Sequence, residues 1–569
     1  MRRGMYSVLF LVMSGIAAAQ EDGGMEAIMK MAGAVSAEEM DSYEAERLFD
    51  FLEHPLKINM VSSSRLSSSG LFTRYQVASL IDYRARHGNV MSLAELAAVD
   101  GFGEDYVTRL APFVSLESMS VGLMKEQVRN DLAIRGAFKD NDGNDWNAGL
   151  KYRFDARGFS LSLAANRSYG GHGAMPSDYS GTAGYDFRRI RGKALVGDFN
   201  ARFGQGLALW NGAFMTALST PSAFMKKPSG ISHSWSYTGG AALSGAAAEI
   251  GVEGFTFSAV LAAPGVKDAA RRPDKVRLMP AANIGWQCRH GQISVTHVAE
   301  ISGFRADDDA RTRIPVMKTS ADAAFCVRGV NVYGEAAYDW VDGNVDVLAG
   351  TDFRTGEKVR LAVLGRYFPG ELYGTAFSGA CKTGTFSVDA IYYPVPKEAS
   401  VRHSIQVKSQ IDWKWTFGRS FSIRMRASER FRTWGNRFRS ELRGDFSYTS
   451  APFVANIRLN ALHCEKIALA GYLEEGFKAD RFSIYARQAI FKADDWDDRI
   501  YVYERDAPGS FNVPALYGRG WSASLVVSAK IASFLRLYAR ASYTGYHFMP
   551  AEKRKPGKAE LKLQTVFNF

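Results

Sequence analysis

The stretch Phe421-Ser422-Ile423-Arg424-Met425-Arg426-Ala427-Ser428 alternates strictly between apolar residues and polar or charged ones. Successive side chains of a β-strand point to opposite faces of the sheet, so this stretch predicts a strand with one apolar and one charged face. Residues 437–448 and 535–544 alternate in nearly the same way. From about residue 119 to the end, such segments follow one another, which predicts a large antiparallel sheet.

The length of these segments favours a membrane over water. A soluble β-sandwich also alternates, but its strands average about 5–6 residues, whereas a tilted strand that crosses a bilayer needs about 9–11. Aromatic residues gather near segment ends, as in Trp413 and Trp415, and such residues mark membrane interfaces. Because bacterial barrels have even strand numbers, we predict that residues 119–569 form a transmembrane β-barrel of about 24 strands.

The amino terminus carries the features of an export signal. Arg2 and Arg3 precede the mostly apolar residues 5–16, and Ala17 to Ala19 offer a small-residue cleavage site. We therefore predict a signal peptide at residues 1–19. No later segment supplies the uninterrupted apolar span of about 20 residues that a membrane helix needs, so insertion is expected to use strands. The last residues, Leu561 to Phe569, alternate and end in Phe, which resembles the signal read by outer-membrane barrel assembly machinery.

Residues 20–118 follow a helical pattern instead. Ser36-Ala37-Glu38-Glu39 reads as a capping box that would start a helix. Helices are also expected over residues 76–87, which Gly88 would end, and over residues 92–98. The predicted fold class is therefore α+β and multidomain, with a small all-α domain at residues 20–118 followed by the barrel.

Part of this helical region resembles a known module. Residues 56–114 are similar to the tandem helix-hairpin-helix module of periplasmic competence DNA receptors, through Ile58-Asn59, residues 80–84 and Val99-Asp100-Gly101-Phe102-Gly103. The resemblance implies that the hairpins hold a DNA phosphate or a partner at a helix amino terminus. The candidate hairpin residues are Gly70, Arg74, Gly101, Phe102, Gly103 and Arg109.

Charge favours a different use of the module. Residues 21–118 hold 16 acidic residues and 8 Lys or Arg, a net charge of −8, while the region after residue 118 carries +17. Nonspecific DNA binding depends on cations that neutralise phosphates, and Glu104 and Asp105 directly follow the second hairpin. A periplasmic protein partner, or docking of this acidic domain at or inside the mouth of the basic barrel, is the other hypothesis, and both stay open.

A barrel of about 24 strands has a wide lumen. Strand side chains alone do not fill it, so it is either plugged or open to solutes. The charged strand faces include a candidate lumen basic patch, formed by Arg424, Arg426, Arg430, Arg437, Arg439 and Arg443. These arginines either attract anions to a pore wall or pair with acids such as Glu429, Glu441 and Asp445.

Over most of its length the chain resembles a family of exported outer-membrane proteins that join helix-hairpin-helix repeats to a large barrel. Two stretches carry this resemblance, residues 197–210 and the segment from Tyr503 to Gly520. Within the first, Gly204-Gln205-Gly206 predicts a bulge or the close approach of another element, such as a plug or the amino-terminal domain.

The sequence shows no recognisable enzyme motif. There is no serine elbow or phosphate-binding glycine loop, and the four Cys and nine His are too scattered to suggest a metal site. No cofactor is expected. The leading hypothesis is a non-enzymatic channel or transport and assembly component of the bacterial outer membrane, with a periplasmic interaction domain. The alternative is a DNA-uptake protein whose module holds DNA phosphates.

Overall fold

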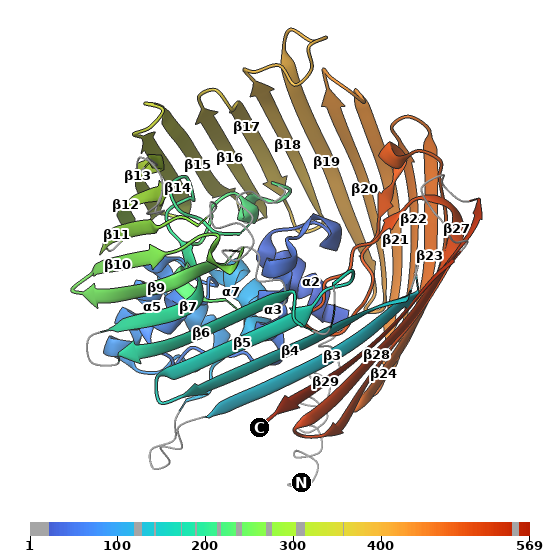
Figure 1. The fold of residues 1–569 in the computed structure, drawn as a ribbon, viewed down its shortest axis with the longest axis horizontal. Coiled ribbons are helices and arrows are strands. Elements are labelled where there is room, and N and C mark those ends of the chain that lie inside the picture. Colours follow the sequence, from blue (N-terminus) through green and yellow to red (C-terminus); the bar gives the residue numbers. More distant parts are fainter. Residues whose placement is uncertain are drawn as a thin grey trace.

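The computed structural model describes residues 22–118, 128–140, 144–171, 173, 175–187, 191–212, 218–234, 242–268, 276–288, 290–302, 313–356, 358–548 and 557–569. The predicted signal peptide lies outside these residues. The described residues form a closed barrel of 24 antiparallel strands, preceded by a small helical region (Figure 1). The predicted fold class and strand number are confirmed.

The barrel strands follow the order of the sequence around the wall. They are β3 (Arg129–Asp140), β4 (Asn144–Ala156), β5 (Phe159–Arg167), β6 (Asp178–Phe187), β7 (Gly192–Arg202), β9 (Leu243–Val252), β10 (Phe255–Ala262), β11 (Met279–Cys288), β12 (Gly291–Ser302), β13 (Arg313–Val327), β14 (Val330–Asp339), β15 (Val345–Thr355), β16 (Val359–Phe368), β17 (Leu372–Ala380), β18 (Gly384–Tyr393), β19 (Ser404–Phe417), β20 (Phe421–Arg432), β21 (Phe438–Ser450), β22 (Phe453–His463), β23 (Ile467–Lys478), β24 (Phe482–Ala493), β27 (Gly518–Ala532), β28 (Leu535–Phe548) and β29 (Gly557–Asn568). Pairing of β29 with β3, in which Phe567 lies opposite Leu132, closes the cylinder.

Each strand turns its apolar face outward and its polar face inward. On β16, Tyr367 is 52% exposed on the outside, while Arg366, its neighbour in sequence, is 7% exposed on the inside. On β20, Phe421 and Met425 are likewise exposed and Arg426 is buried. A continuous exposed apolar surface of this kind would drive aggregation in water, whereas the hydrocarbon of a bilayer solvates it.

The two ends of the barrel differ in their connections. At one end, called here the short-turn end, strands are joined by short turns, some of only two residues, such as Arg157-Gly158, Glu253-Gly254 and Arg328-Gly329. The carboxyl terminus lies at this end, because the Phe569 ring stacks on Phe534 of the turn between β27 and β28. At the opposite, long-loop end, the connections after β7 and β24 are much longer.

The helical region precedes the barrel in the chain. Its helices are α2 (Asp22–Ala32), α3 (Ser42–Glu53), α4 (Ser63–Ser68), α5 (Arg74–His87), α6 (Leu93–Ala98) and α7 (Glu104–Leu110). The short strands β1 (Leu56–Lys57) and β2 (Val114–Ser115) pair in parallel and tie the two ends of the module together. Thr73 and Gln76 form a capping box at the start of α5, and Gly88 ends this helix, as predicted.

The predicted capping box at Ser36 is wrong. Residues 37–39 form only a short 3-10 turn, and the Ser36 side chain makes no capping hydrogen bond. The helix begins at Ser42 instead, where the Asp41 carboxylate accepts a hydrogen bond from the Glu44 N–H at 3.1 Å. Asp41 thus satisfies the free N–H groups, and Glu38 is left for a different role described below.

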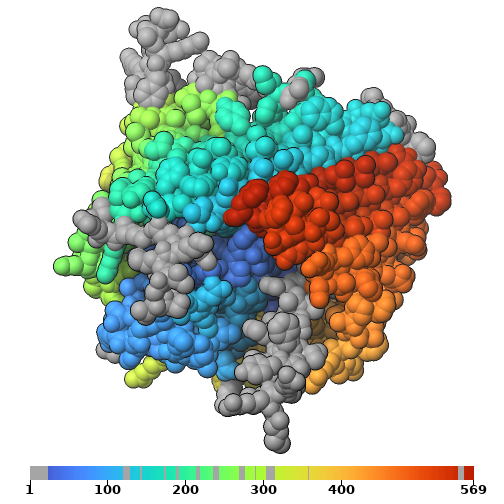
Figure 2. All heavy atoms as spheres, turned by 90° about the horizontal axis from the view of Figure 1, so that it is seen from below, coloured from blue at the N-terminus to red at the C-terminus, as the bar shows by residue number. Residues whose placement is uncertain are grey.

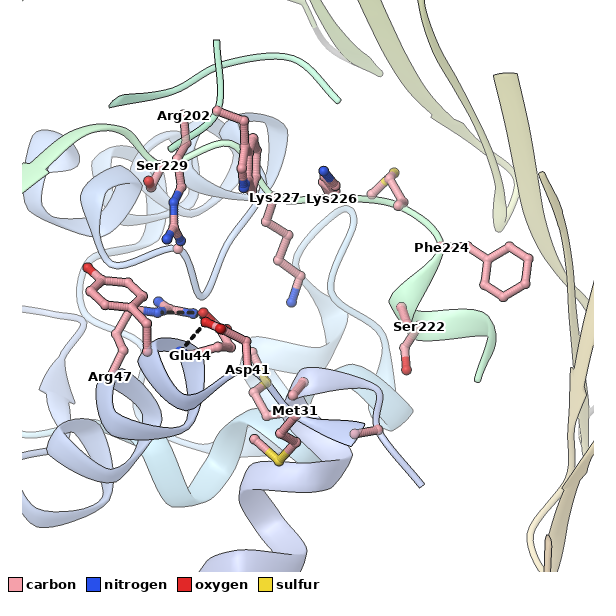
Figure 3. Close-up of a pocket in the computed structure, with 18 of the residues that line it drawn as sticks. Met31, Asp41, Glu44, Arg47, Arg202, Ser222, Phe224, Lys226, Lys227 and Ser229 are labelled. Carbon is pink, nitrogen blue, oxygen red and sulfur yellow. Dashed lines mark hydrogen bonds and ion pairs between the residues drawn. The ribbon is translucent and has the colours of Figure 1, made fainter. Parts of the chain in front are cut away.

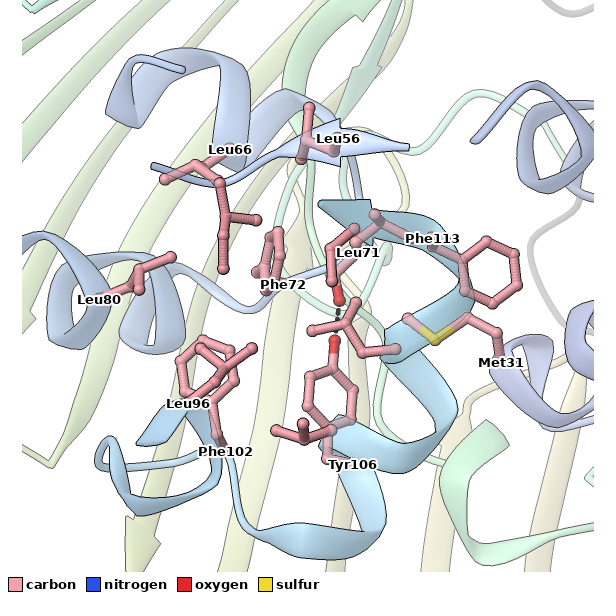
Figure 4. Close-up of a cluster of buried hydrophobic side chains, with 14 of the residues drawn as sticks. Met31, Leu56, Leu66, Leu71, Phe72, Leu80, Leu96, Phe102, Tyr106 and Phe113 are labelled. Carbon is pink, nitrogen blue, oxygen red and sulfur yellow. Dashed lines mark hydrogen bonds between the residues drawn. The ribbon is translucent and has the colours of Figure 1, made fainter. Parts of the chain in front are cut away.

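The helical region has a hydrophobic core of its own. Leu71, Phe72, Leu96 and Phe102 pack together between α4, α5, α6 and α7 (Figure 4). The Tyr106 hydroxyl reaches into this core and donates a hydrogen bond to the Leu71 carbonyl. A polar tip that finds a partner in the interior avoids the cost of an unsatisfied hydroxyl, so the core holds α7 in a defined position.

This helical region lies inside the barrel. Viewed from below, the helical region is visible in the opening of the barrel, beside the first and last strands (Figure 2). Its side chains form hydrogen bonds or ion pairs with β3, β4, β7, β11, β15, β19, β20, β21, β22 and β28. Contacts with strands on all sides of the wall make residues 22–118 a plug, and this name is used below.

A glycine marks the place where β7 leaves the wall. Gly197 has a φ of +106°, and a Cβ there would collide with the Gly181 carbonyl oxygen on β6. We expect Gly197→Ala to destabilise the barrel by about 3 kcal/mol through backbone strain and this clash. The measurement is the temperature at which the folded band is lost in unboiled gels. Gly136→Ala on β3, which meets open space, is the control, and equal melting of the two variants would contradict the expectation.

Candidate functional site: the plug and the barrel lumen

Acidic side chains of the plug pair with basic side chains of the barrel wall. The pairs are Glu26 with Lys414 (2.7 Å), Glu39 with Arg426 (3.3 Å), Glu38 with Arg443 (3.1 Å) and Arg458 (2.6 Å), Asp50 with Arg129 (2.8 Å) and Arg153 (2.9 Å), Glu53 with Arg536 (3.3 Å), Glu46 with Lys151, and Asp105 with Arg354. In one pair the charges are exchanged, with Arg65 of the plug on Asp155 (3.1 Å). The opposite net charges of the two regions are therefore expressed as specific contacts.

Glu38 contacts three groups at once. Its carboxylate lies between the Arg443 and Arg458 guanidiniums and also accepts a hydrogen bond from the Tyr503 N–H at 2.9 Å. Asp445 on β21 joins the same cluster, because it pairs with both arginines. Burial by itself would raise the pKa of Glu38, but the two guanidiniums and the N–H hold it well below its usual range.

Asp50 forms a second anchor, on a different part of the barrel wall. Its two carboxylate oxygens face Arg129 on β3 and Arg153 on β4, and His54, one helical turn later, lies 2.9 Å from the Arg129 guanidinium. Burial opposes ionisation here too, yet the cations keep the pKa of Asp50 well below its ordinary value. The plug is thus held to the first strands of the barrel as well as to β21 and β22.

Acid is expected to release the plug. The pKa of Glu26 lies at about 2 because Lys30 and Lys414 outweigh the effect of burial, and Glu38 and Asp50 are also lowered. Carboxylates with lowered pKa values stabilise the seated plug fully above their ordinary pKa of about 4, and lose that contribution as the pH falls below it. Limited proteolysis of the folded protein at pH 7 and pH 3 checks this. A plug that is equally protected at both values would contradict the expectation.

The long connection after β7 folds inward and packs on the plug. Tyr43 accepts a hydrogen bond from the Asn200 side chain at 2.6 Å, Thr220 donates one to the Gly33 carbonyl at 2.7 Å, and Ser219 donates one to Glu39 at 2.8 Å. The short strand β8 (Gly230–His233) pairs with the end of β7 and returns the chain toward the wall. The described residues from Asp198 to Ser234 are called the inward segment below.

The inward segment also explains the Gly204-Gln205-Gly206 stretch. β7 ends at Arg202, and Gly204 has a φ of +58° and comes so close to Glu335 of β14 that a Cβ would lie 2.8 Å from its carboxylate. The same carboxylate accepts a hydrogen bond from the Gln205 N–H at 2.6 Å. The predicted close approach is therefore to Glu335, across the lumen, and the neighbouring Phe203 ring lies under Arg74 of the plug.

The second stretch that carries the family resemblance lies in the lumen as well. Between β24 and β27, the strands β25 (Ile500–Tyr501) and β26 (Ala515–Leu516) form a small separate hairpin. The chain that joins them pairs with the wall through Glu504 with Arg540, Arg505 with Glu474, and Asp506 with Lys562. Because Tyr503 also contacts Glu38 of the plug, this connection narrows the lumen together with the plug.

The structure separates the candidate hairpin residues. Gly70 packs on the Arg47 guanidinium, and Arg74, only 5% exposed, faces Asn283 on β11. Gly101 packs on Tyr75 and Phe102 is in the plug core, while Gly103 opens to solvent. Arg109 stacks on the Tyr106 ring. With the plug seated, a DNA duplex has no access to Gly70 or Arg74, and DNA binding stays a prediction.

The candidate lumen arginines do not form a single patch. Arg424 and Arg426 pair with Asp412, and Arg426 and Arg443 also reach Glu39 and Glu38 of the plug. Arg439 donates hydrogen bonds to the Asp497 and Arg499 carbonyls. Arg437 is exposed, and Arg430 lies near the long-loop end of β20, past Arg426. Among the acids considered beforehand, Asp445 is the one that pairs with these arginines.

Within the part of the chain that the structure describes, no group of three or more His, Cys, Asp or Glu side chains is placed to hold a metal ion. Among the same residues, no helix is both long and apolar enough to cross a membrane.

Sequence reasoning missed the acids that anchor the plug. Glu26, Glu38, Glu39 and Asp50 were not singled out as site residues, and Glu38 was assigned to a helix cap. The excess of acids in residues 21–118 is a signal that an electrostatic contact exists. It does not identify the partners, because these depend on how the plug is oriented in the barrel.

No protein-family model and no curated protein matches the chain. Among solved structures, it is similar to the translocation pore of the P pilus usher PapC, with 7% identity and a TM-score of 0.39 over 78% of this chain and 99% of that one. It is also similar to the copper transporter OprC, with 9% identity and a TM-score of 0.38 over 78% of this chain and 80% of that one. The siderophore receptor PirA from Pseudomonas aeruginosa is similar with 6% identity and a TM-score of 0.41, over 78% of this chain and 81% of that one. The function of this chain is therefore inferred from its own residues.

Proposed function

We propose that this chain is a non-enzymatic channel or transport component of the bacterial outer membrane, closed at rest by its own amino-terminal domain. The observation that carries the proposal is the set of ion pairs between plug acids and wall bases, above all Glu38 with Arg443 and Arg458. A plug held by separable polar contacts, rather than by a continuous apolar interface, is suited to be displaced without unfolding the barrel.

In this proposal the helix-hairpin-helix-like module acts as the plug and not as a DNA-binding module. Its acidic surface supports this role, because the wall that surrounds it is basic. The short-turn end, where the plug sits, faces the periplasm in this proposal, since short turns are periplasmic in bacterial barrels of known orientation. A periplasmic partner would then reach the plug directly.

Orientation is tested by labelling single cysteines in intact cells, in a background where the four native Cys are replaced by Ser. A membrane-impermeant maleimide should modify Ala399→Cys, on the connection between β18 and β19 at the long-loop end. It should not modify Lys382→Cys, in the turn between β17 and β18, until the outer membrane is opened. The reverse labelling pattern would refute the proposed orientation.

Channel activity is tested with proteoliposomes that contain the full chain. At neutral pH, the vesicles should exclude a small sugar, and they should admit it after a shift to pH 3, because acids whose pKa values are lowered in the seated plug take up protons when the plug is released. Restoring neutral pH should reseal them. Free sugar entry at neutral pH would argue against a plugged resting state, and exclusion at both pH values would argue against a displaceable plug.

A further inference from the structure

A cavity of about 160 Å³ lies between the plug and the inward segment, with no assigned role (Figure 3). Its floor is formed by the plug around Tyr43 and Arg47, and its roof by the inward segment around Arg202, Trp210 and Lys227. A cavity of about 150 Å³ accommodates a molecule the size of benzene. The space therefore suits a small organic ligand.

The charges that face this cavity do not balance. Its acids are already engaged, because Glu44 pairs with Arg47, Glu39 pairs with Arg426, and Asp41 caps α3. In contrast, Arg202 and Lys227 form no ion pair with any residue that the structure describes. Both point from the inward segment toward the Arg47–Glu44 pair (Figure 3). Glu44 interacts electrostatically with both of them as well as with Arg47, so three cations share one carboxylate and an added anion would stabilise them.

Both cations are held in place by neutral neighbours. The Arg202 Nε donates a hydrogen bond to the Asn211 carbonyl at 2.9 Å, and its guanidinium lies 5.0 Å from the Tyr43 ring and 5.5 Å from the Trp210 ring. The Lys227 ammonium lies 3.3 Å from the Tyr106 hydroxyl and 4.6 Å from the centre of that ring. These contacts orient the two side chains without adding a negative charge.

The titration of Lys227 is consistent with this imbalance. Burial, together with the nearby Arg109 and Arg47 cations, lowers the pKa of Lys227 to about 7, and the opposing effect of Glu44 is smaller. The rest of the lining is mixed, with apolar surface from Met31, Met40 and Met225 and polar groups from Lys226, Gln205 and several serines. The cavity thus combines cations with a polarisable apolar surface.

We propose that this cavity binds a small carboxylate with a compact apolar or aromatic body, the carboxylate lying between Arg202 and Lys227. A guanidinium and an ammonium together satisfy both oxygens of a carboxylate, and the methionine and aromatic side chains cover the body. Because the ligand contacts the plug and the inward segment at once, it stabilises the arrangement in which the two are together. Binding does not require that the barrel conducts, so it is tested separately from the proposed function.

The test is calorimetry on the full chain in detergent, with benzoate as the probe and benzyl alcohol as the uncharged ligand of similar size. Benzoate should bind saturably, and benzyl alcohol at least about tenfold more weakly, since the alcohol carries no charge for Arg202 and Lys227 to pair with. Absence of benzoate binding, or equal binding of the two compounds, would overturn the proposal.

Variants assign the binding to the two cations. Lys227→Met and Arg202→Gln should each weaken benzoate binding by about tenfold or more. Lys382→Met, at an exposed turn, should leave it unchanged. Lys227→Met replaces a buried charge by an apolar chain of similar length, so the barrel is expected to fold, which unboiled gels verify. Unchanged affinity in the folded Lys227→Met and Arg202→Gln variants would show that these cations are not the site.

Discussion

Removal of residues 22–118 is expected to turn a closed barrel into a conducting one. In planar bilayers, the shortened chain should conduct at least about tenfold more current than the full chain at neutral pH, because a barrel of 24 strands leaves a wide lumen once its plug is gone. The increase comes from the loss of the helices that contact the wall on all sides. The inward segment and the β25–β26 hairpin remain and limit the final conductance.

The control for this deletion is a chain that keeps the plug but carries a neutral change on its surface. Glu104→Gln suits this purpose, because Glu104 is exposed and its carboxylate forms no hydrogen bond or ion pair with the residues that the structure describes. The barrel of the deletion variant must still migrate as a folded species in unboiled gels. A folded deletion variant with the conductance of the full chain would show that the plug does not close the pore.

The second large effect is expected at Glu38. Glu38→Gln keeps the shape of the side chain but leaves Arg443 and Arg458 to share Asp445 alone. Removing one partner of a buried charge cluster costs about 3–5 kcal/mol, so the closed state should lose most of its advantage over the open one. Opening events in bilayers at neutral pH should become at least about a hundredfold more frequent.

The specificity of this effect is checked by comparison with Glu104→Gln, which removes one negative charge from the same domain. If opening depended on the net charge of the plug alone, the two variants would behave alike. If Glu38 acts through its contacts with β21 and β22, only Glu38→Gln opens the barrel. Equal opening frequencies in Glu38→Gln and the unchanged chain would refute the role assigned to this cluster.

The barrel could be predicted because its signal is local. Alternation in the stretch from Phe421 to Ser428 depends only on the two-residue period of a strand, and the structure places Phe421 and Met425 outside and Arg426 inside. Strand number followed from repeated segments of this kind. The helices over residues 76–87 and 92–98 were found through equally local signals, such as Ser92 as a helix cap.

The arrangement inside the lumen could not be predicted in the same way. Glu38 satisfies the local pattern of a capping box, yet Asp41 caps the helix and Glu38 meets Arg443, about 400 residues later in the chain. Such a contact depends on the orientation of the plug, which no short segment specifies. The excess of acids before residue 118 made docking on the basic barrel one of the open hypotheses, while the individual partners required the three-dimensional structure.

The most direct test of a displaceable plug is a cross-link between the plug and the inward segment. Ser219 and Glu39 are joined by a hydrogen bond of 2.8 Å, so Ser219→Cys and Glu39→Cys, in a background without native Cys, should be bridged by a short cleavable thiol reagent. Single-cysteine variants and the unfolded double variant are the controls. The bridged protein should stay closed at pH 3 and open once the bridge is cleaved. Failure to cross-link in the folded protein, or opening at pH 3 with the bridge intact, would contradict a plug that closes the lumen by occupying it.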